Sequence, residues 1–276
     1  MTTRTWFITG ASSGLGREMT EQLLARGDRV AATVRHPAVL DALKAAHGER
    51  LWVARLDLTD TPAIAATVRR AFAELGRIDV VVNNAGYAVF GAAEEASPAQ
   101  VRHQIDTNLT GSIELIRAVL PHLRGQGGGR VLQVSSEGGQ LAYPNFSLYH
   151  ATKWGIEGFV EAVAQEVAPF HIEFTLVEPG PANTGFAAGL VHTAPMPAYQ
   201  QTPAGAMRRA MADGSFAIPG NAGKIVQAMI GSVDTSPAPR RLTLGAGAYQ
   251  RIRAALLERL AALDGQQAIA CSTDDA

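Results

Sequence analysis

The segment SLYHATKWG, residues 147–155, places a tyrosine and a lysine four positions apart, Tyr149 and Lys153. Positions i and i+4 share one face of a helix, so both side chains can point to the same site. An unperturbed tyrosine titrates near ~10, which is too high for easy proton transfer at neutral pH. A neighbouring ammonium group favours the tyrosinate and lowers that pKa. The pair therefore predicts a proton donor, provided that other elements bring it a reacting partner.

Strand-like apolar runs alternate with helix-length segments along the chain. We expect strands at residues 5–9, 29–34, 51–58, 78–86, 130–136, 172–180 and 241–244. We expect helices at residues 14–26, 38–46, 61–75, 98–123, 147–168 and 222–232, with Asp60 as the N-cap of the third. The strands are short and nearly continuously apolar, as in parallel strands buried on both faces. The alternation predicts an α/β fold with a doubly wound parallel sheet of about seven strands flanked by helices.

The composition describes a globular protein without a charge imbalance. Of 276 residues, 47% are hydrophobic and 18% charged, which favours one large domain spanning residues 1–276. The net charge of −1, from 24 basic and 25 acidic residues, gives no reason to expect nucleic acid or an anionic membrane as a partner. The single cysteine, Cys271, excludes an intrachain disulfide. No apolar run approaches the ~18 residues of a membrane span, so a cytoplasmic location is expected.

Two regions depart from the alternating pattern. Residues 181–220 contain several prolines and the side chains of Met196, Tyr199 and Phe216. Long irregular insertions in compact domains are often lids or binding loops, so we expect an irregular or helical lid before the last helix. Residues 264–276 are polar, and we expect a flexible tail there.

The sequence TGASSGLG, residues 9–16, joins the first strand to the first helix. Its glycines, Gly10, Gly14 and Gly16, would let backbone N–H groups and a helix N-terminus approach a pyrophosphate. The spacing differs from the usual dinucleotide pattern G-x-G-x-x-G, and no P-loop lysine follows. A tight strand-to-helix turn could need the same glycines. The position between a strand and a helix favours the binding of a dinucleotide cofactor.

The end of the second strand distinguishes two cofactors. A carboxylate there would bind the ribose hydroxyls of NAD(H), whereas an arginine accommodates the 2′-phosphate of NADP(H). The strand ends in Arg35 with no acidic residue nearby, which favours NADP(H), with Ser12 or Ser13 as helpers. A solvated loop arginine is the alternative, and NAD(H) then stays open. Asp57, at the end of the third strand, could accept a hydrogen bond from the adenine amino group or cap the next turn.

Seven motifs fall in register along the chain. They are TGASSGLG at 9–16, LDLTD at 56–60, NNAG at 83–86, Asn108 within DTNLTG, VSS at 134–136, YHATK at 149–153 and PGPANT at 179–184. With them, nearly the whole chain resembles the short-chain dehydrogenase/reductase family, in its hydroxysteroid and retinol dehydrogenase-like branch. The resemblance implies a Rossmann-like fold, a nicotinamide cofactor, and a homodimer or homotetramer.

The resemblance also implies a catalytic set of Asn108, Ser136, Tyr149 and Lys153. Ser135 competes for the serine role, but the family pattern from serine to tyrosine aligns with SEGGQLAYPNFSLY, which starts at Ser136. Together with the residues discussed above, the expected cofactor contacts are Gly10, Ser12, Ser13, Gly14, Leu15, Gly16, Arg35, Asp57, Leu58, Asn84, Ala85, Gly86, Tyr149, Lys153, Pro179, Gly180 and Thr184.

These residue types suit the transfer of a hydride to a carbonyl group, which leaves an alkoxide that needs a proton. Tyr149 is the expected general acid and base, and Lys153 tunes it and binds the nicotinamide ribose. Ser136 is expected to hold the substrate oxygen, and Asn108 to place a water that links Lys153 to solvent. Ligands of open α/β sheets bind outside the carboxyl ends of the strands, where these motifs fall.

Several other polar residues receive ordinary interpretations. His150 falls on a different helical face from Tyr149 and Lys153 and is expected to be exposed. Glu137, directly after the serine, could touch the substrate, but a solvated loop acid is the preferred interpretation. The seven histidines form no HxxxH pair, so no metal site is expected. Seven apolar residues could line a substrate pocket, although half of them could belong only to the core or an interface. They are Leu141, Tyr143, Phe146, Phe186, Met196, Tyr199 and Phe216.

The sequence thus predicts an NADP(H)-preferring oxidoreductase that interconverts a secondary alcohol and a ketone or aldehyde, with a small to medium hydrophobic carbonyl compound as substrate. A non-catalytic NADP(H)-sensing regulator on the same fold is the alternative. The intact Asn, Ser, Tyr and Lys set argues against it, because a sensor needs no proton donor. A dehydratase or epimerase of nucleotide sugars would have a different glycine spacing and a longer chain.

Overall fold

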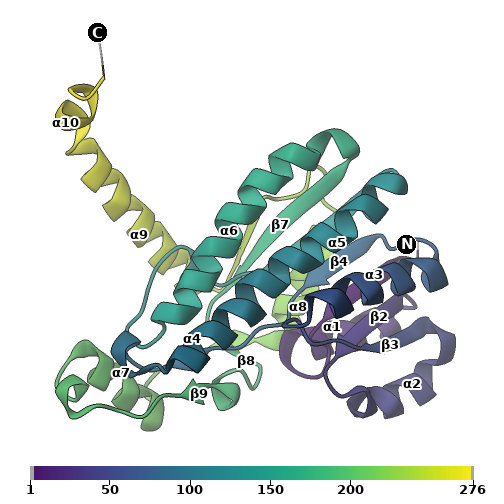
Figure 1. Ribbon diagram of the computed structural model, residues 1–276, viewed down its shortest axis with the longest axis horizontal. Coiled ribbons are helices and arrows are strands. Elements are labelled where there is room, and N and C mark those ends of the chain that lie inside the picture. Colours follow the sequence, from purple (N-terminus) through teal and green to yellow (C-terminus); the bar gives the residue numbers. More distant parts are fainter. Residues whose placement is uncertain (1–2, 275–276) are drawn as a thin grey trace.

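A seven-stranded parallel sheet forms the centre of the molecule (Figure 1). The computed structural model describes residues 3–274, and the strand order is β11-β7-β6-β4-β1-β2-β3. The strands are β1 (Thr5–Thr9), β2 (Arg29–Val34), β3 (Leu51–Arg55), β4 (Val80–Asn83), β6 (Gly129–Val134), β7 (Ile172–Pro179) and β11 (Arg241–Leu244). Two small pairs lie outside the sheet, β5 (Val89–Phe90) with β9 (Val191–His192) and β8 (Ala182–Asn183) with β10 (Gly220–Asn221). The predicted doubly wound parallel sheet is confirmed.

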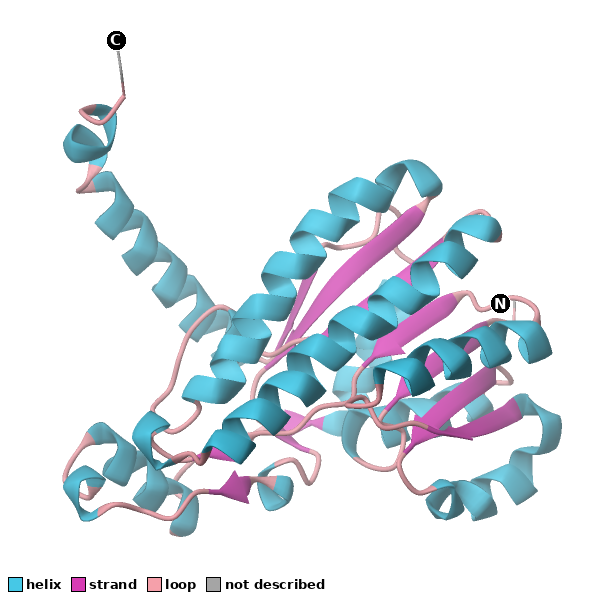
Figure 2. Ribbon diagram, in the orientation of Figure 1, coloured by secondary structure: helices cyan, strands magenta, loops and turns pink. Residues whose placement is uncertain are grey.

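Helices connect the strands and cover both faces of the sheet (Figure 2). They are α1 (Gly14–Ala25), α2 (Asp41–His47), α3 (Thr61–Leu75), α4 (Pro98–Ile105), α5 (Gly111–Gly125), α6 (Ser147–Val167), α7 (Pro203–Ala212), α8 (Ala222–Ser232), α9 (Ala246–Asp264) and α10 (Gln267–Cys271). The predicted cap of α3 is confirmed, since the Asp60 carboxylate accepts a 3.0 Å hydrogen bond from the Ala63 amide.

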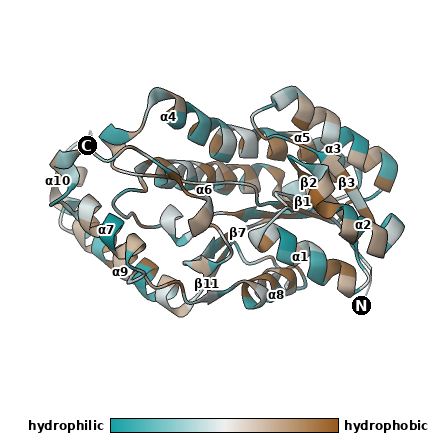
Figure 3. Cartoon of the chain, turned by 90° about the horizontal axis from the view of Figure 1, so that it is seen from below, coloured by the Kyte–Doolittle hydropathy of each residue, from teal (hydrophilic) through white to brown (hydrophobic). Residues whose placement is uncertain are grey.

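Two hydrophobic cores lie on opposite faces of the sheet (Figure 3). Successive residues of a strand point to opposite faces, so Trp6 and Ile8 pack under α1 and α8 while Phe7 packs under α3 and α5. All three side chains have no exposed surface, and each such burial contributes roughly 1.5–3 kcal/mol. The sheet is therefore held rigidly from both sides, and its strand ends form a fixed edge.

The predicted helix over residues 98–123 is interrupted. A π-helical turn, Asp106–Thr110, separates α4 from α5, and the Gly111 amide donates to the Asp106 carbonyl. A Cβ at Gly111 would collide with the backbone and side chain of Leu58, so the helix passes very close to the chain after β3. Single π-turns within helices occur often at functional sites.

A C-terminal helix, α9, leads away from the body of the molecule and was not expected from the sequence (Figure 1). Only Ala248 and Ile252 of its residues are buried. Its outward side exposes Leu256, Leu257, Leu260 and Leu263, each at least 48% exposed. The short α10 follows in the segment 264–276, of which residues 275–276 lie outside the described part.

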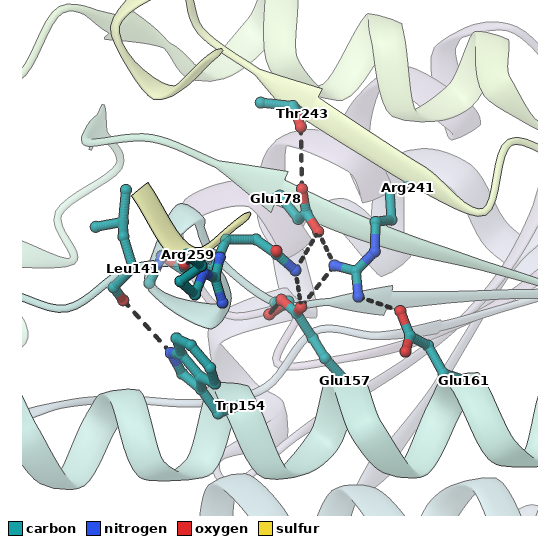
Figure 4. A network of polar contacts seen from close by, with 12 residues as sticks. Leu141, Trp154, Glu157, Glu161, Glu178, Arg241, Thr243 and Arg259 are labelled. Atoms are coloured by element: carbon teal, nitrogen blue, oxygen red, sulfur yellow. Dashed lines mark hydrogen bonds and ion pairs between the residues drawn. The ribbon is translucent and has the colours of Figure 1, made fainter. Parts of the chain in front are cut away.

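A buried ion-pair network joins α6, β7 and β11 behind the strand ends (Figure 4). Arg241 pairs with Glu157 at 2.6 Å and also with Glu178 and Glu161. The Thr243 hydroxyl donates to Glu178 at 2.9 Å. Because Glu157 and Glu178 are almost fully buried, one arginine balances two carboxylates inside the protein. This network fixes the edge strand β11 to the helix that carries Tyr149 and Lys153.

Within residues 3–274, no helix has the length and apolar character needed to cross a membrane. The same residues contain no group of three or more His, Cys, Asp or Glu side chains that could hold a metal ion.

Candidate active site

A cavity of about 760 Å³ lies at the carboxyl ends of the strands. Its walls include Gly10 after β1, Arg35 after β2, Asn84 after β4, Ser136 after β6 and Gly180 after β7. The strand order changes direction at β1, which has β2 on one side and β4 on the other. Open α/β sheets bind their ligands at such a switch point.

The glycine loop forms one end of this cavity. Gly10 and Gly14 have φ angles of +69° and +56°, which favour glycine. Gly16 does not line the cavity but packs against the turn, where an added Cβ would collide with the Gly10 carbonyl oxygen and the side-chain Nδ2 of Asn84, 2.6 Å away. No side chain caps the N-terminus of α1, so its first N–H groups are available to an anion. The positive φ angles and the helix N-terminus fit the pyrophosphate of a dinucleotide.

Asn84 binds the loop after β4 to β1. Its side-chain amide donates to the Thr9 carbonyl at 2.9 Å, and the amides of Asn84 and Ala85 both donate to the Thr9 hydroxyl. These bonds hold the backbone of residues 84–86 along the cavity wall. The side chain of Asn84 thus holds the NNAG segment in place, and the backbone of this segment forms part of the cavity wall.

Asn108 sits in the π-turn and is only 2% exposed. Its Oδ1 accepts from the Tyr87 amide at 3.1 Å, and its Nδ2 donates to the Tyr87 carbonyl at 2.8 Å and to Thr152 at 3.4 Å. The side chain therefore fixes Tyr87 against α6 and does not line the cavity.

Ser136, Tyr149 and Lys153 meet on the cavity wall. The Lys153 ammonium lies 5.4 Å from the centre of the Tyr149 ring and donates to the Val134 carbonyl at 2.9 Å. The Ser136 hydroxyl accepts from the Gly138 amide at 3.0 Å. The neighbouring Ser135 hydroxyl instead donates to Glu157 at 2.5 Å. Ser136 is thus the serine whose hydroxyl is not bonded to the buried network.

Burial dominates the electrostatics of this pair. It raises the pKa of Tyr149 to about 12, against a lowering by hydrogen bonding to Ser136 and with a further rise from the charge of Glu137. Burial also lowers the pKa of Lys153 to about 8, although the nearby charge of Glu157 opposes this. The expected lowering of the Tyr149 pKa by Lys153 is therefore wrong for the protein alone. At neutral pH the phenol is protonated.

Arg35 and Asp57 lie on the cavity wall at the ends of β2 and β3. Asp57 accepts hydrogen bonds from the Thr59 amide at 3.0 Å and from the Thr59 hydroxyl at 2.8 Å, so it caps the next turn. The bond from the Thr59 amide is the largest cause that lowers the pKa of Asp57, and the charges of Arg35 and His103 lower it further. His103 and Gln100, which α4 places on the same wall, were missed because no local pattern marks them.

Two predictions about polar residues are wrong. His150 is 5% exposed rather than solvent-facing, and its ring bridges the Gly138 carbonyl at 2.8 Å and the Tyr143 amide at 2.9 Å. The amide must donate, so the ring is neutral with its proton on Nδ1, and burial lowers its pKa accordingly. Glu137 is 2% exposed rather than solvated, and it pairs with Arg251 at 2.8 Å. The residues that contact His150 and Glu137 are not their neighbours in the sequence, so no local pattern predicts their burial.

The rest of the cavity wall is largely apolar and aromatic. Four of the seven candidate residues line it, namely Tyr143, Phe146, Phe186 and Phe216. Tyr199 instead donates its hydroxyl to Glu94 at 2.6 Å, and the Met196 amide donates to Glu95 at 2.8 Å. The remaining expected contacts on the wall are Ser12, Ser13, Leu15, Leu58, Ala85, Gly86, Pro179 and Thr184.

The comparison with known families identifies the chain. A family model described as short chain dehydrogenase matches residues 4–194. The chain belongs to the short-chain dehydrogenase family. It is thereby an NAD(P)-dependent oxidoreductase acting on CH–OH groups, as the resemblance of its motifs implied.

Individual relatives in the short-chain dehydrogenase family agree. Oxidoreductase BOA17 of Botryotinia fuckeliana is 38% identical over 252 residues, covering 90% of this chain and 91% of its own. Human retinol dehydrogenase 8 is 35% identical over 206 residues, covering 72% of this chain and 65% of its own. The crystal structure of a short-chain dehydrogenase from Streptomyces avermitilis has 37% identity and a TM-score of 0.91, with 99% of each chain covered.

More distant structures share the fold with different cofactors. One from Burkholderia cenocepacia, with NADP, has a TM-score of 0.75 at 24% identity, covering 94% of this chain and 95% of its own. Another from Burkholderia phymatum, with NAD, has a TM-score of 0.79 at 20% identity, covering 91% and 92%. The fold alone therefore does not select between the two nicotinamide cofactors.

Proposed function

We propose that this short-chain dehydrogenase is an NADP(H)-preferring enzyme that interconverts a secondary alcohol and a ketone or aldehyde. The observation that carries the proposal is the Tyr149 phenol, which burial keeps protonated on the wall of a cavity that it shares with Ser136 and Lys153. A sensor of NADP(H) would not need a half-buried proton donor beside a serine hydroxyl and an ammonium group.

The proposed roles follow from the positions of these groups. A bound nicotinamide supplies the hydride or accepts it. Ser136 donates a hydrogen bond to the substrate oxygen, and Tyr149 gives its proton to the alkoxide. The Lys153 ammonium, 5.4 Å from the ring centre, stabilises the tyrosinate that remains. Asn108 supports the site by holding Tyr87 and Thr152.

The preference for NADP(H) rests on Arg35. This arginine lies on the cavity wall at the end of β2, and the acid that follows β3, Asp57, is engaged by Thr59. A guanidinium group binds a phosphate with a planar pair of donors. Arg35 can thus meet a 2′-phosphate, while the glycine loop holds the pyrophosphate.

The substrate is proposed to be a small to medium hydrophobic carbonyl compound. The support is the set of aromatic residues on the cavity wall, Phe146, Phe186 and Phe216, of which the first two lie beside the Tyr149 ring. A relative that is named retinol dehydrogenase fits a hydrophobic alcohol as the reduced partner.

Replacing Tyr149 tests the proposed acid. In Tyr149→Phe we expect NADPH-dependent reduction of a carbonyl panel to fall by about 10²–10⁴-fold, because the proton donor is lost. NADPH binding, followed by the fluorescence of the reduced cofactor, should persist. Retention of more than about a tenth of the activity would contradict the role of Tyr149. NADPH binding without any turnover by the wild type would favour the non-catalytic sensor.

Replacing Arg35 tests the cofactor preference. In Arg35→Ala and Arg35→Asp we expect the Kd for NADP⁺ to rise by about tenfold or more, because a charge-assisted contact contributes roughly 1.5–3 kcal/mol. The Kd for NAD⁺ should change little. Arg55→Ala, which removes an exposed arginine that ends β3 and does not line the cavity, is the matched control. Equal losses for both cofactors in the Arg35 variants would refute the phosphate contact.

The family resemblance also leads us to propose a homodimer or homotetramer. The exposed leucines of α9 are apolar surface that a second copy could cover. Sedimentation velocity at micromolar concentrations should show the assembled species. A monomer under these conditions would contradict this part of the proposal.

A further inference from the structure

The chain between the proposed catalytic residues Ser136 and Tyr149 begins with a closed loop, residues 137–143. The Tyr143 hydroxyl donates to Glu137 at 2.8 Å across the top of this loop. Below it, the neutral His150 ring bonds the Gly138 carbonyl and the Tyr143 amide. Glu137 and Tyr143 both line the cavity, so the 137–143 loop forms part of the wall that faces a substrate.

Glu137 is a buried carboxylate in the middle of this wall. Its two oxygens accept hydrogen bonds from Arg251 of α9, with Nη2 at 2.8 and 3.1 Å and Nε at 3.2 Å. Tyr143 of the loop bonds it as well, and Tyr149 and His150 of α6 lie within reach of its charge. Among the described residues, Arg251 is the cation that pairs with Glu137.

The close approach of α9 depends on a glycine. A Cβ at Gly180, which lines the cavity after β7, would lie 3.0 Å from the Ala248 Cβ. It would also lie 3.6 Å from both the Arg251 guanidinium and the Glu137 carboxylate. The absence of a side chain at Gly180 therefore lets the first turns of α9 pack against the cavity wall from behind Gly180.

A second arginine of α9 contacts the same loop. Arg259 donates to the Gln140 carbonyl at 2.7 Å, and its guanidinium lies 5.0 Å from the centre of the Trp154 ring (Figure 4). The Trp154 indole donates to the Leu141 carbonyl at 3.4 Å. Arg251 and Arg259 are about two helical turns apart and lie on one face of the helix. Two arginines of α9 thus contact the loop, while the leucines of the same helix are exposed.

We propose that Arg251 is a positioning residue for the reaction, acting through Glu137 to keep Ser136 and Tyr149 in their working arrangement. The inference rests on the proposed function, since it concerns the same tyrosine and serine. Without Arg251, the buried Glu137 carboxylate would lie uncompensated beside Tyr149. It would then disfavour the tyrosinate more strongly or draw the loop away from the cavity.

The experiment compares four variants of the full-length enzyme with the wild type, namely Arg251→Met, Arg251→Lys, the double variant Glu137→Gln with Arg251→Met, and Arg253→Met. The readouts are kcat, KM, the pH profile of alcohol oxidation, and the Kd for NADPH. Arg253 lies on the same helix, is exposed, and makes no described side-chain contact, so it controls for the loss of one positive charge.

In Arg251→Met we expect kcat to fall about tenfold. The pH at which the rate of alcohol oxidation increases should move up by about one unit. The Kd for NADPH should stay unchanged. Arg251→Lys should recover most of the rate. The double variant, which has no buried charge to balance, should return the pH profile toward that of the wild type, and Arg253→Met should match the wild type.

Two results would overturn the role of Arg251 in an active enzyme. One is a wild-type rate and pH profile in Arg251→Met. The other is a double variant with the same shifted profile as Arg251→Met, which would show that the loss is not caused by the unpaired carboxylate. If Arg251→Met does not fold, the single variant Glu137→Gln provides the test, measured by its pH profile of alcohol oxidation. Removing the carboxylate should move this profile to lower pH. A profile that does not move would refute the proposal. Inactivity of the wild type on the carbonyl panel would instead refute the proposed function itself.

Discussion

Burial shifts Tyr149 and Lys153 in opposite directions, and both shifts favour the uncharged side chain. The sequence pattern predicts that the two groups share a face, but it implies a lowered tyrosine pKa. The structure gives a raised one, because the residues that bury the phenol come from several distant segments. A tyrosine of this kind is held ready to donate a proton rather than to accept one.

The raised pKa of Tyr149 predicts a directional pH dependence. Below about pH 12 the phenol form prevails, so carbonyl reduction should change little between about pH 6 and the Lys153 pKa of about 8, while the ammonium keeps its charge. Alcohol oxidation needs the tyrosinate, whose fraction grows with pH, so its kcat/KM should rise over the same range. Steady-state rates in both directions at constant ionic strength check this. Oxidation that slows as the pH rises would contradict the assignment.

The elements that carry the site depend on a few buried contacts between them. Arg241, on the edge strand β11, balances Glu157 of α6 and Glu178 of β7 (Figure 4). Burial and the charge of Glu157 raise the pKa of Glu178, while its bonds to Arg241 lower it. Gln140 also donates to Glu157 at 2.5 Å, which links the 137–143 loop to the network. The position of this loop thus depends on a strand that is remote in the sequence.

Removing the Arg241 cation should destabilise the protein strongly. In Arg241→Met we expect a loss of about 3–5 kcal/mol in the free energy of unfolding, because two carboxylates stay buried without their partner. Urea denaturation at neutral pH measures it. Arg240→Met is the matched control, since Arg240 is exposed and its described contact is a backbone carbonyl that accepts from the Leu176 amide. Equal denaturation midpoints for the two variants would show that the network is not stabilising.

The sequence predicts some elements well and others poorly, for identifiable reasons. The helix over 222–232 and the strand over 241–244 were predicted with the bounds that the structure has, because their apolar patterns are local. The π-turn at Asp106–Thr110 has no such pattern, since it arises where Gly111 approaches Leu58. The pairing of Glu137 with Arg251 spans 114 positions, so neither residue carries a local sign of the other. The glycine loop at residues 9–16 could be recognised from the sequence, because its glycines directly follow one strand and directly precede one helix.

At the scale of the whole molecule, one sheet is shared by both hydrophobic cores. Trp6 belongs to one core and Phe7 to the other, although they are neighbours on β1. Neither core can lose its packing without exposing the strand that supports the other. This supports the prediction of one domain spanning residues 1–276, whose first two and last two residues lie outside the described part.

A single cooperative transition should follow from the shared sheet. Calorimetry of the purified protein should give one unfolding peak whose calorimetric and van't Hoff enthalpies agree per cooperative unit. NADPH at about 100 times its Kd should raise the stability by about 2.7 kcal/mol and move the whole peak upward. Two separated peaks, of which only one responds to NADPH, would show two independent units.

The pairing of Glu137 with an arginine near the end of the chain also has a consequence for biosynthesis. The ribosome releases Glu137 well before Arg251, which lies 114 positions later. Until α9 emerges, a nascent chain can form the glycine loop after β1, but its Glu137 lacks the arginine that pairs with it in the complete protein. A polypeptide cut short before α9 would thus have most of the architecture without the final alignment. If Arg251 positions the site as proposed, competence in turnover is acquired last, after translation has passed the helix that leads away from the body.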